Sequence, residues 1–223
     1  EWDQDGRREI YKAAQLDKTK ISQISSIAND IGIPAFFSVF NINDAEFIKS
    51  LKFNIIKIPS HEISNIPLIK YCIDNFETIL LSAGACTKVE LQNAVDIINV
   101  SDRNIILMHC VSSYPCEYEN ANLKRIAYLR SISQNSTIGF SDHTDSIILP
   151  AAAAVYGAEV IEKHFTTNKD LPGRDNKFAM LPGQFKEMVK NHQEVKQGLI
   201  DKGIDYQPCE ENTVQNYRGR WGK

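Results

Sequence analysis

Two short motifs in this chain end in groups that can bind a metal ion. Ser-Asp-His-Thr at 141–144 and Glu-Lys-His-Phe at 162–165 each follow an apolar run, and their histidines, His143 and His164, are 21 residues apart. Histidine is the commonest metal ligand, and imidazoles at the ends of successive strands can converge on one ion. Either histidine alone is more often a core residue bonded to a backbone carbonyl. As a pair they favour a metal site.

Carboxylates close to the two histidines indicate which kind of ion would suit them. Asp142, Glu162 and Asp175 are oxygen ligands, which favour a hard divalent ion such as Mn²⁺ or Mg²⁺ with water in the remaining positions. His109, one strand earlier, is either a third ligand or a structural residue.

A second group of polar residues has the chemistry of an anion site. Lys57 lies in the apolar run 55–59, where strand alternation points it away from Ile56 and Ile58. It is either a lysine whose stem covers an exposed edge or a clamp for an anion. Ser60 and Ser82 alone are more often capping or turn residues, but beside a lysine they become candidate donors to a phosphate or carboxylate. Further polar residues at strand ends are Ser38, Tyr114 and Ser141.

Two carboxylates are candidates for proton transfer. Glu62 follows Ser60 by two residues and is either a general acid or base or an exposed carboxylate at a helix N-terminus. Asp175 lies in the turn-rich loop 171–177, which is either plain surface or an active-site loop that brings Asp175, and with it Arg174, over a pocket.

These residues need a fold that brings strand ends together, and the hydrophobic pattern supplies one. Six apolar runs rich in Ile, Val and Phe begin 19 to 32 residues apart, and stretches of helical periodicity follow them. This alternation predicts parallel strands buried on both faces, with the ligand at their carboxyl ends. The expected strands are 35–40, 54–58, 78–81, 104–109, 136–140 and 159–162, with helices that include 10–16, 20–31, 44–51, 64–75, 88–98 and 148–156.

The number of strand–helix units bears on the fold class. A (β/α)8 barrel needs eight units, and only six are recognisable here, so either the sheet is open or the first two strands of a barrel lie outside this chain. We expect an incomplete TIM barrel as the catalytic domain over residues 1–200. Residues 201–223, which contain three glycines and a proline, are expected to form an irregular extension or linker.

Composition excludes several classes of partner. The formal net charge of −3 gives no basic field for nucleic acid, and the apolar runs are too short to span a bilayer. Five widely spaced cysteines without a CxxC pair indicate neither a disulfide framework nor a zinc ribbon and predict a reducing, cytoplasmic environment.

Seven ordered segments resemble the sialic acid synthase family, whose members condense phosphoenolpyruvate with an N-acetylated aldose to make nonulosonic acids. Together they run through most of residues 6–200, which makes the resemblance far more specific than any single motif. The segments are 36–38, 57–62, 81–84, 109–110 with 114–115, 141–144, 162–166 and 171–177.

The resemblance implies a TIM-barrel enzyme of sialic acid biosynthesis that is metal-dependent and takes an acceptor such as N-acetylmannosamine. It implies a homodimer and a divalent ion, Mn²⁺ or Mg²⁺, held by His143 and His164. Glu62, Glu162 and Asp175 fall at positions that line the sugar and water side of the site. Phosphoenolpyruvate would be held by Lys57, Ser60, Ser82, Tyr114 and Ser141, with Ser38 as a further contact.

Departures from the family pattern leave the acceptor sugar open. Family members commonly carry Gly at position 61, Thr-Gly-Met at 83–85, Thr-Asn at 111–112 and His at 176, where this chain has His61, Ala-Gly-Ala, Val-Ser and Asn176. The family's first two strands and its C-terminal antifreeze-like domain are not recognisable, so we expect the chain to correspond to the middle of a synthase. Two alternatives remain: a related metal-dependent aldolase that uses pyruvate, with Lys57 as a Schiff-base former, and a truncated or degenerate barrel that binds a sugar acid without turnover.

Overall fold

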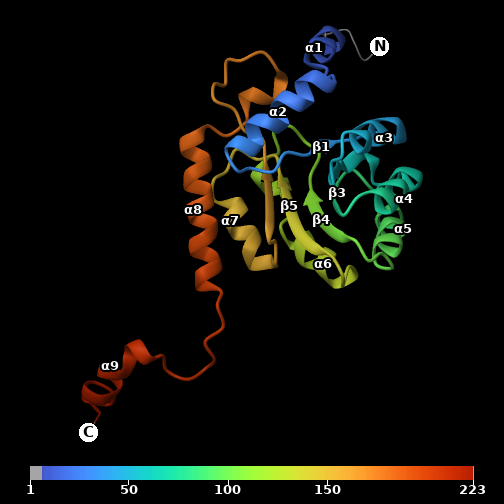
Figure 1. Ribbon diagram of the computed structural model, residues 1–223. Coiled ribbons are helices and arrows are strands. Elements are labelled where there is room, and N and C mark those ends of the chain that lie inside the picture. The colour runs from blue at the N-terminus through green and yellow to red at the C-terminus, as the bar shows by residue number, and fades with distance from the viewer. Residues whose placement is uncertain (1–6, 223) are drawn as a thin grey trace.

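Six parallel strands form one curled sheet, a half-barrel, in the computed structural model, which describes residues 7–222 and their side chains from residue 8 onward (Figure 1). Each strand pairs with its neighbours in the sequence, so the order is β1-β2-β3-β4-β5-β6. Within residues 7–222 no further strand pairs with the outer edges of β1 and β6, so this sheet is open. The strands are β1 (Phe37–Ser38), β2 (Ile55–Ile58), β3 (Thr78–Ala83), β4 (Asn104–Cys110), β5 (Thr137–Asp142) and β6 (Val160–Lys163).

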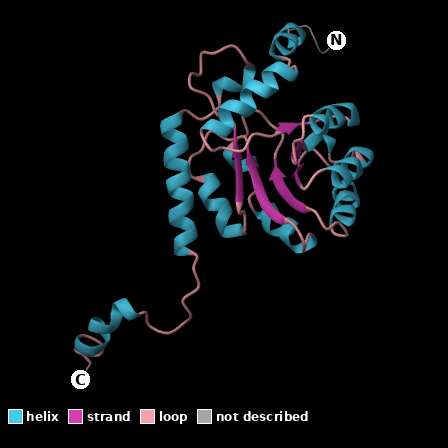
Figure 2. Ribbon diagram, viewed as in Figure 1, coloured by secondary structure: helices cyan, strands magenta, loops and turns pink. Residues whose placement is uncertain are grey.

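Helices connect the strands and cover the outer side of the sheet, as the cyan and magenta ribbons of Figure 2 show. Since each crossover returns the chain to the same edge, all six strands end at one side of the domain. The helices are α1 (Arg7–Ala14), α2 (Lys18–Asp30), α3 (Ile42–Ser50), α4 (Ile66–Asn75), α5 (Lys88–Ile98), α6 (Lys124–Ile132), α7 (Leu149–Ala153), α8 (Pro182–Gly198) and α9 (Glu211–Asn216).

Local sequence explains where several of these helices begin. The Asn41 side chain accepts a hydrogen bond from the Asp44 backbone N–H at the start of α3. At the start of α5, the Thr87 hydroxyl accepts from the Glu90 N–H while the Glu90 carboxylate accepts from the Thr87 N–H, which is a complete capping box. Each cap satisfies backbone donors that the first helical turn leaves unpaired.

The hydrophobic core lies between the strands and the covering helices. Ile56, Ile58, Leu81 and Leu107 are fully buried along β2, β3 and β4, and Phe140 of β5 joins the same cluster. Side chains on both faces of these strands are buried, which agrees with the continuous apolar runs in the sequence. The burial of branched aliphatic side chains on the helix side holds the curled sheet to its cover.

Most of the expected elements are confirmed, with differences at the edges. The first strand, expected at 35–40, is reduced to Phe37–Ser38, and the first two helices begin two or three residues earlier than expected. Helices α6 and α8 complete the alternation. In the segment expected to be irregular, a short helix α9 forms and lies apart from the domain (Figure 1). No helix within residues 7–222 is long and apolar enough to cross a membrane.

One imidazole belongs to the core. His109 of β4 is fully buried, its Nε2 lies 2.8 Å from the Ala121 carbonyl oxygen, and its ring stacks on Phe140 with centroids 5.4 Å apart. Burial lowers the pKa of His109 to about 4, against the opposing effect of the Ala121 hydrogen bond. The ring is therefore neutral in the folded protein at neutral pH, and of the two roles expected for His109 the structure supports the structural one.

Gly139 in the middle of β5 leaves no room for a side chain. An added Cβ would lie 2.9 Å from the Val160 carbonyl oxygen and 3.1 Å from the Met108 side chain. We expect Gly139→Ala to lower the free energy of unfolding by about 1–3 kcal/mol, because the neighbouring strands must move. Urea unfolding measures this. Gly183→Ala in α8, where no atom lies within 4 Å, is the control and should leave stability unchanged or slightly raised.

The low pKa of His109 predicts a dependence of stability on pH. Above about pH 6.5 the ring is neutral in both states; between pH 6.5 and 4 the unfolded chain takes up a proton and the folded protein does not. The free energy of unfolding should thus fall by about 3 kcal/mol as the pH drops through this window. His109→Gln should flatten that part of the profile in urea titrations at pH 7 and pH 4.5. An unchanged pH dependence in the variant would contradict the assignment.

Candidate functional site

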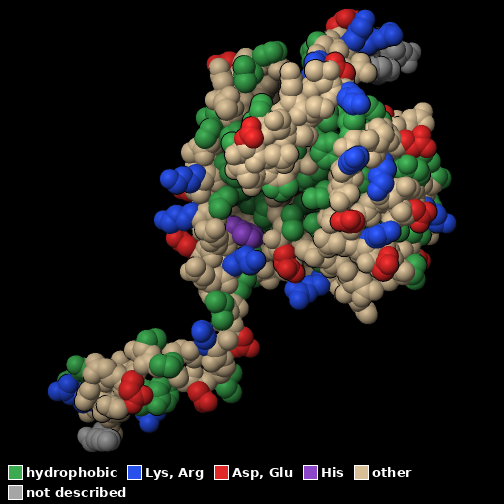
Figure 3. Space-filling model, viewed as in Figure 1, with side chains coloured by type: hydrophobic (Ala, Val, Ile, Leu, Met, Phe, Trp, Pro, Cys, Tyr) green, Lys and Arg blue, Asp and Glu red, His purple; other side chains and the backbone are tan. Residues whose placement is uncertain are grey.

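A cavity of about 1460 Å³ opens at the carboxyl ends of the strands. The space-filling view shows a hollow at the centre of one face, with hydrophobic side chains within it (Figure 3). Residues from all six strand ends line the cavity, together with the 171–178 loop and two residues of α1. The lining groups that carry polar chemistry include Ser38, Lys57, Ser60, Ser82, Ser112, Tyr114, Ser141, His143, Glu162, His164 and Asp175.

An ion pair spans the cavity from β2 to β6. The Lys57 ammonium nitrogen lies 2.9 Å from Glu162 Oε1 and 2.7 Å from Oε2. Lys57 is 5% exposed, so its charge is largely removed from water and depends on this partner. Lysine carries three N–H donors, and two of them are used here. The third is a candidate donor to an anionic ligand.

Serine hydroxyls surround the lysine. Ser60 Oγ and Ser112 Oγ are 2.7 Å apart and form a hydrogen bond. Ser141 is buried at the end of β5. Ser82 is 1% exposed, and within the described part of the chain its hydroxyl has no hydrogen-bond partner. A buried, unpaired hydroxyl that lines a cavity costs free energy unless a ligand or water satisfies it.

The charge state of Glu162 follows from its neighbours. Burial acts to raise the pKa of Glu162, but the Lys57 ammonium and hydrogen bonds from Lys57 and Ser141 outweigh burial and bring the pKa below its ordinary value. The carboxylate is therefore ionised at neutral pH. In this state it can accept a proton and cannot donate one.

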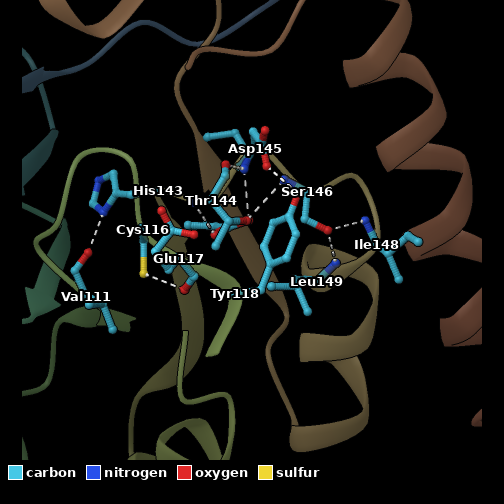
Figure 4. Close-up of polar contacts among 12 residues, drawn as sticks. Val111, Cys116, Glu117, Tyr118, His143, Thr144, Asp145, Ser146, Ile148 and Leu149 are labelled. Carbon is cyan, nitrogen blue, oxygen red and sulfur yellow. Dashed lines mark hydrogen bonds and ion pairs between the residues drawn. The ribbon is translucent and has the colours of Figure 1, made fainter. Parts of the chain in front are cut away.

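The two histidines face each other in the same cavity, with ring centroids 5.2 Å apart. His143 Nδ1 lies 2.9 Å from the Val111 carbonyl oxygen, a contact visible in Figure 4. Since a carbonyl only accepts, Nδ1 carries the proton and the Nε2 lone pair of His143 is available. His164 Nδ1 lies 3.5 Å from an Asp175 carboxylate oxygen. The Tyr114 ring packs against His143 at a tilt of 51°, with a centroid distance of 4.2 Å.

This donor set fits a divalent ion. Histidines that ligate metals usually donate the second ring N–H to a backbone carbonyl or a carboxylate; His143 has such a partner in Val111, and the Asp175 carboxylate lies 3.5 Å from His164 Nδ1. Burial lowers the pKa of both histidines, which favours the neutral form that binds metals. No group of three or more His, Cys, Asp and Glu residues between positions 7 and 222 is arranged to hold an ion. Two imidazoles thus leave the other ligand positions to water or substrate.

Some predicted site residues lie elsewhere. Glu62, in the short helix η1 (Ser60–Glu62), does not line the cavity, and its carboxylate accepts a hydrogen bond of 2.8 Å from the Asn65 side chain. Asp142, considered above as a carboxylate near the ion, also lies outside the lining and pairs with Lys163, which does border the cavity. The ten remaining predicted site residues line the cavity: Ser38, Lys57, Ser60, Ser82, Tyr114, Ser141, His143, Glu162, His164 and Asp175.

The sequence did not identify two residues that the structure places at the site. Ser112 lies two residues beyond the end of β4, and its position after an apolar run was a usable signal. Phe178 packs on His164 with a centroid distance of 5.1 Å. It follows the loop 171–177, and no sequence pattern links it to a histidine fourteen residues earlier.

Several known proteins with similar sequences are synthases. N,N'-diacetyllegionaminic acid synthase of Legionella pneumophila is 36% identical over 188 residues, covering 82% of this chain and 52% of that protein. Pseudaminic acid synthase of Helicobacter pylori is 33% identical over 218 residues, covering 97% of this chain and 63% of that protein. The chain therefore spans between half and two thirds of the length of these two relatives.

A solved structure and a family model agree with these relatives. The crystal structure of N-acetylneuraminic acid synthetase from Leptospira borgpetersenii, in complex with citrate, superimposes with a TM-score of 0.85 at 30% identity, over 95% of this chain and 74% of that one. The model of the NeuB family matches residues 1–203. The chain therefore belongs to the NeuB family, and its half-barrel with a cavity at the strand ends agrees with this.

Proposed function

We propose that the protein containing this chain condenses phosphoenolpyruvate with an N-acetylated hexosamine, such as N-acetylmannosamine, and releases phosphate to give a nonulosonic acid. The observation that carries the proposal is that Lys57 with its serines, and the pair His143 and His164, line one cavity. An anionic donor and a carbonyl acceptor can therefore meet there. Membership of the NeuB family supports the same reaction.

The donor side of the reaction belongs to Lys57 and the hydroxyls around it. Phosphoenolpyruvate carries a phosphate and a carboxylate, which the third N–H of Lys57 and the hydroxyls of Ser60, Ser82 and Ser141 would bind. Charge-assisted hydrogen bonds of this kind are stronger than neutral ones. Tyr114 and Ser38 line the same cavity and would complete the contacts.

The carboxylates serve the water and sugar side. Ionised Glu162 would accept a proton from the water that adds to the donor carbon, and Lys57 holds it in place. Asp175 would orient His164 from the loop above the cavity. We assign no part in the reaction to Glu62, which lies outside the lining.

The histidine pair would hold the ion in a partly enclosed position. A divalent ion, Mn²⁺ or Mg²⁺, supplies a Lewis acid that polarises a carbonyl oxygen when it is bound. Tyr114 packs against His143 and Phe178 against His164, which restricts the positions of the two imidazoles. Burial raises the pKa of Tyr114 to about 12, so the hydroxyl stays neutral and acts as a donor.

The aldolase alternative is less well supported. Schiff-base formation needs a neutral amine, whereas the carboxylate of Glu162 contacts Lys57 through both of its oxygens and stabilises the charged ammonium. If pyruvate and borohydride modified Lys57, the aldolase reaction would be better supported than the condensation with phosphoenolpyruvate.

Phosphate release tests the proposed reaction. The intact protein, incubated with phosphoenolpyruvate, Mn²⁺ and a panel of N-acetylated hexosamines, should release inorganic phosphate in equal amount to a nonulosonic acid detected by mass spectrometry. Since His143 and His164 are proposed to hold the ion, we expect a chelator to abolish the release. Binding of phosphoenolpyruvate by calorimetry without phosphate release for any sugar would instead support a barrel that binds without turnover.

Ser82 offers a sharper test of the donor site. Ser82→Ala should weaken phosphoenolpyruvate binding about 10- to 100-fold, since a hydrogen bond to a charged group contributes roughly 1.5–3 kcal/mol. Calorimetric titration measures the change. Ser25→Ala is a matched control, because the Ser25 hydroxyl is also buried without a partner among the described residues but belongs to α2 and does not line the cavity. Equal affinities for both variants would remove Ser82 from the donor site.

A further inference from the structure

A buried ion pair joins the chain neighbours of the two cavity histidines. Lys163 Nζ lies 2.9 Å from Asp142 Oδ2, and the two side chains are 2% and 0% exposed. Asp142 precedes His143, and Lys163 precedes His164. The pair therefore links β5 to β6 immediately before both candidate metal ligands.

The same two side chains also bind the residue that follows His143. Thr144 donates its backbone N–H to Asp142 Oδ1 over 2.9 Å and its hydroxyl to Asp142 Oδ2 over 3.0 Å. Lys163 donates a further hydrogen bond to the Thr144 carbonyl oxygen. Lys163 therefore contacts the residues on both sides of His143 in the chain, Asp142 and Thr144.

The loop beyond Thr144 is held in place as well (Figure 4). The Thr144 hydroxyl accepts from the Ser146 N–H, and the Tyr118 hydroxyl donates to the Asp145 carboxylate over 2.6 Å. The His143 carbonyl accepts from the Cys116 N–H over 2.9 Å. The His143 backbone is therefore restrained independently of any ligand in the cavity.

The position of the pair in the sheet explains why a link is needed there. The parallel register of β5 and β6 runs from Gly139 and Val160 to Asp142 and Lys163, and stops. Beyond it the two histidines have no ladder hydrogen bonds to each other. The ion pair is the last contact between the two strands before the histidines, whose rings both lie in the cavity.

Stability alone is a weak reason for such a pair. Removing two charges from water costs about as much as their attraction returns, and packed apolar side chains often serve a core equally well. A role in fixing the geometry of the two strand ends accounts better for a complete network of charged hydrogen bonds at this place.

We propose that Asp142 and Lys163 are positioning residues, a strand-end clamp that sets the separation of His143 and His164 and thereby the affinity of the site for a divalent ion. This inference rests on the proposed function in one respect: both require an ion to bind between the two histidines. Lys163 borders the cavity, whereas Asp142 lies outside its lining. The effect of the clamp passes through the backbone of the two strand ends.

Manganese binding by the intact protein tests the clamp. Three variants weaken it to different degrees: Asp142→Asn, which keeps an acceptor for the Thr144 N–H; Lys163→Met; and the double variant, which leaves no unpaired buried charge. We expect Mn²⁺ titrations followed by electron paramagnetic resonance to show 10- to 100-fold weaker binding, the range found for residues that orient metal ligands. The visible spectrum of bound Co²⁺ should shift in the same variants.

Two controls separate positioning from general effects. Lys190→Met removes an exposed lysine of α8 that pairs with Glu194 at 3.5 Å, so it changes charge without touching the strand ends. Leu129→Ala removes a fully buried side chain of α6 and lowers stability far from the cavity. Both should bind Mn²⁺ with the affinity of the unchanged protein and give its Co²⁺ spectrum.

The outcomes distinguish the clamp from the reaction. If the unchanged protein binds Mn²⁺ and the folded clamp variants bind within threefold of it, the clamp is overturned and the proposed reaction stands. If Leu129→Ala weakens Mn²⁺ binding as much as Asp142→Asn, the effect is loss of stability and the clamp is again overturned. If the unchanged protein binds no Mn²⁺, the ion leaves the proposed reaction and the clamp falls with it.

Discussion

The ion pair between Lys57 and Glu162 depends on the curl of the sheet, and the site depends on both. Lys57 lies on β2 and Glu162 on β6, four strand spacings away in the ladder. In a flat sheet these positions would be about 19 Å apart, beyond the reach of the two side chains. Their atoms meet at 2.7 Å because the twisted sheet curls and brings β2 and β6 towards each other. The curl thus brings residues of distant strands into one cavity.

Two kinds of chemistry follow from this arrangement. A cation with hydroxyls lies on the β2 and β3 side, and a pair of neutral imidazoles lies on the β5 and β6 side. Burial affects the charges on both sides. It requires Lys57 to have a counterion, and it keeps His143 and His164 in the unprotonated form. The same low-polarity surroundings that make charges costly also strengthen any contact that a bound anion or ion makes.

Much of the fold was predictable because its pattern repeats. Strands such as 104–109 and 136–140 are continuous apolar runs, and parallel strands buried on both faces produce that pattern. Helices α6 and α8 gave weaker signals because few of their side chains are buried: Ile126 and Leu129 in α6, and Met188 in α8. The strand-end rule also predicted which residues share the cavity, but it failed for Glu62, whose position in a tight helical turn directs it to Asn65.

Sequence alone determined the alternation of strands and helices and the chemical types at each strand end, because both are local properties of the chain. It indicated His143 and His164 as a pair and Lys57 with its serines as another. Tertiary structure left the Ser82 hydroxyl without a hydrogen-bond partner among residues 7–222. It also decided the contacts that depend on distance in space: the pairing of Lys57 with Glu162 and the buried link between Asp142 and Lys163. These contacts join residues far apart in the sequence, and only the curvature and register of the sheet determine which side chains meet.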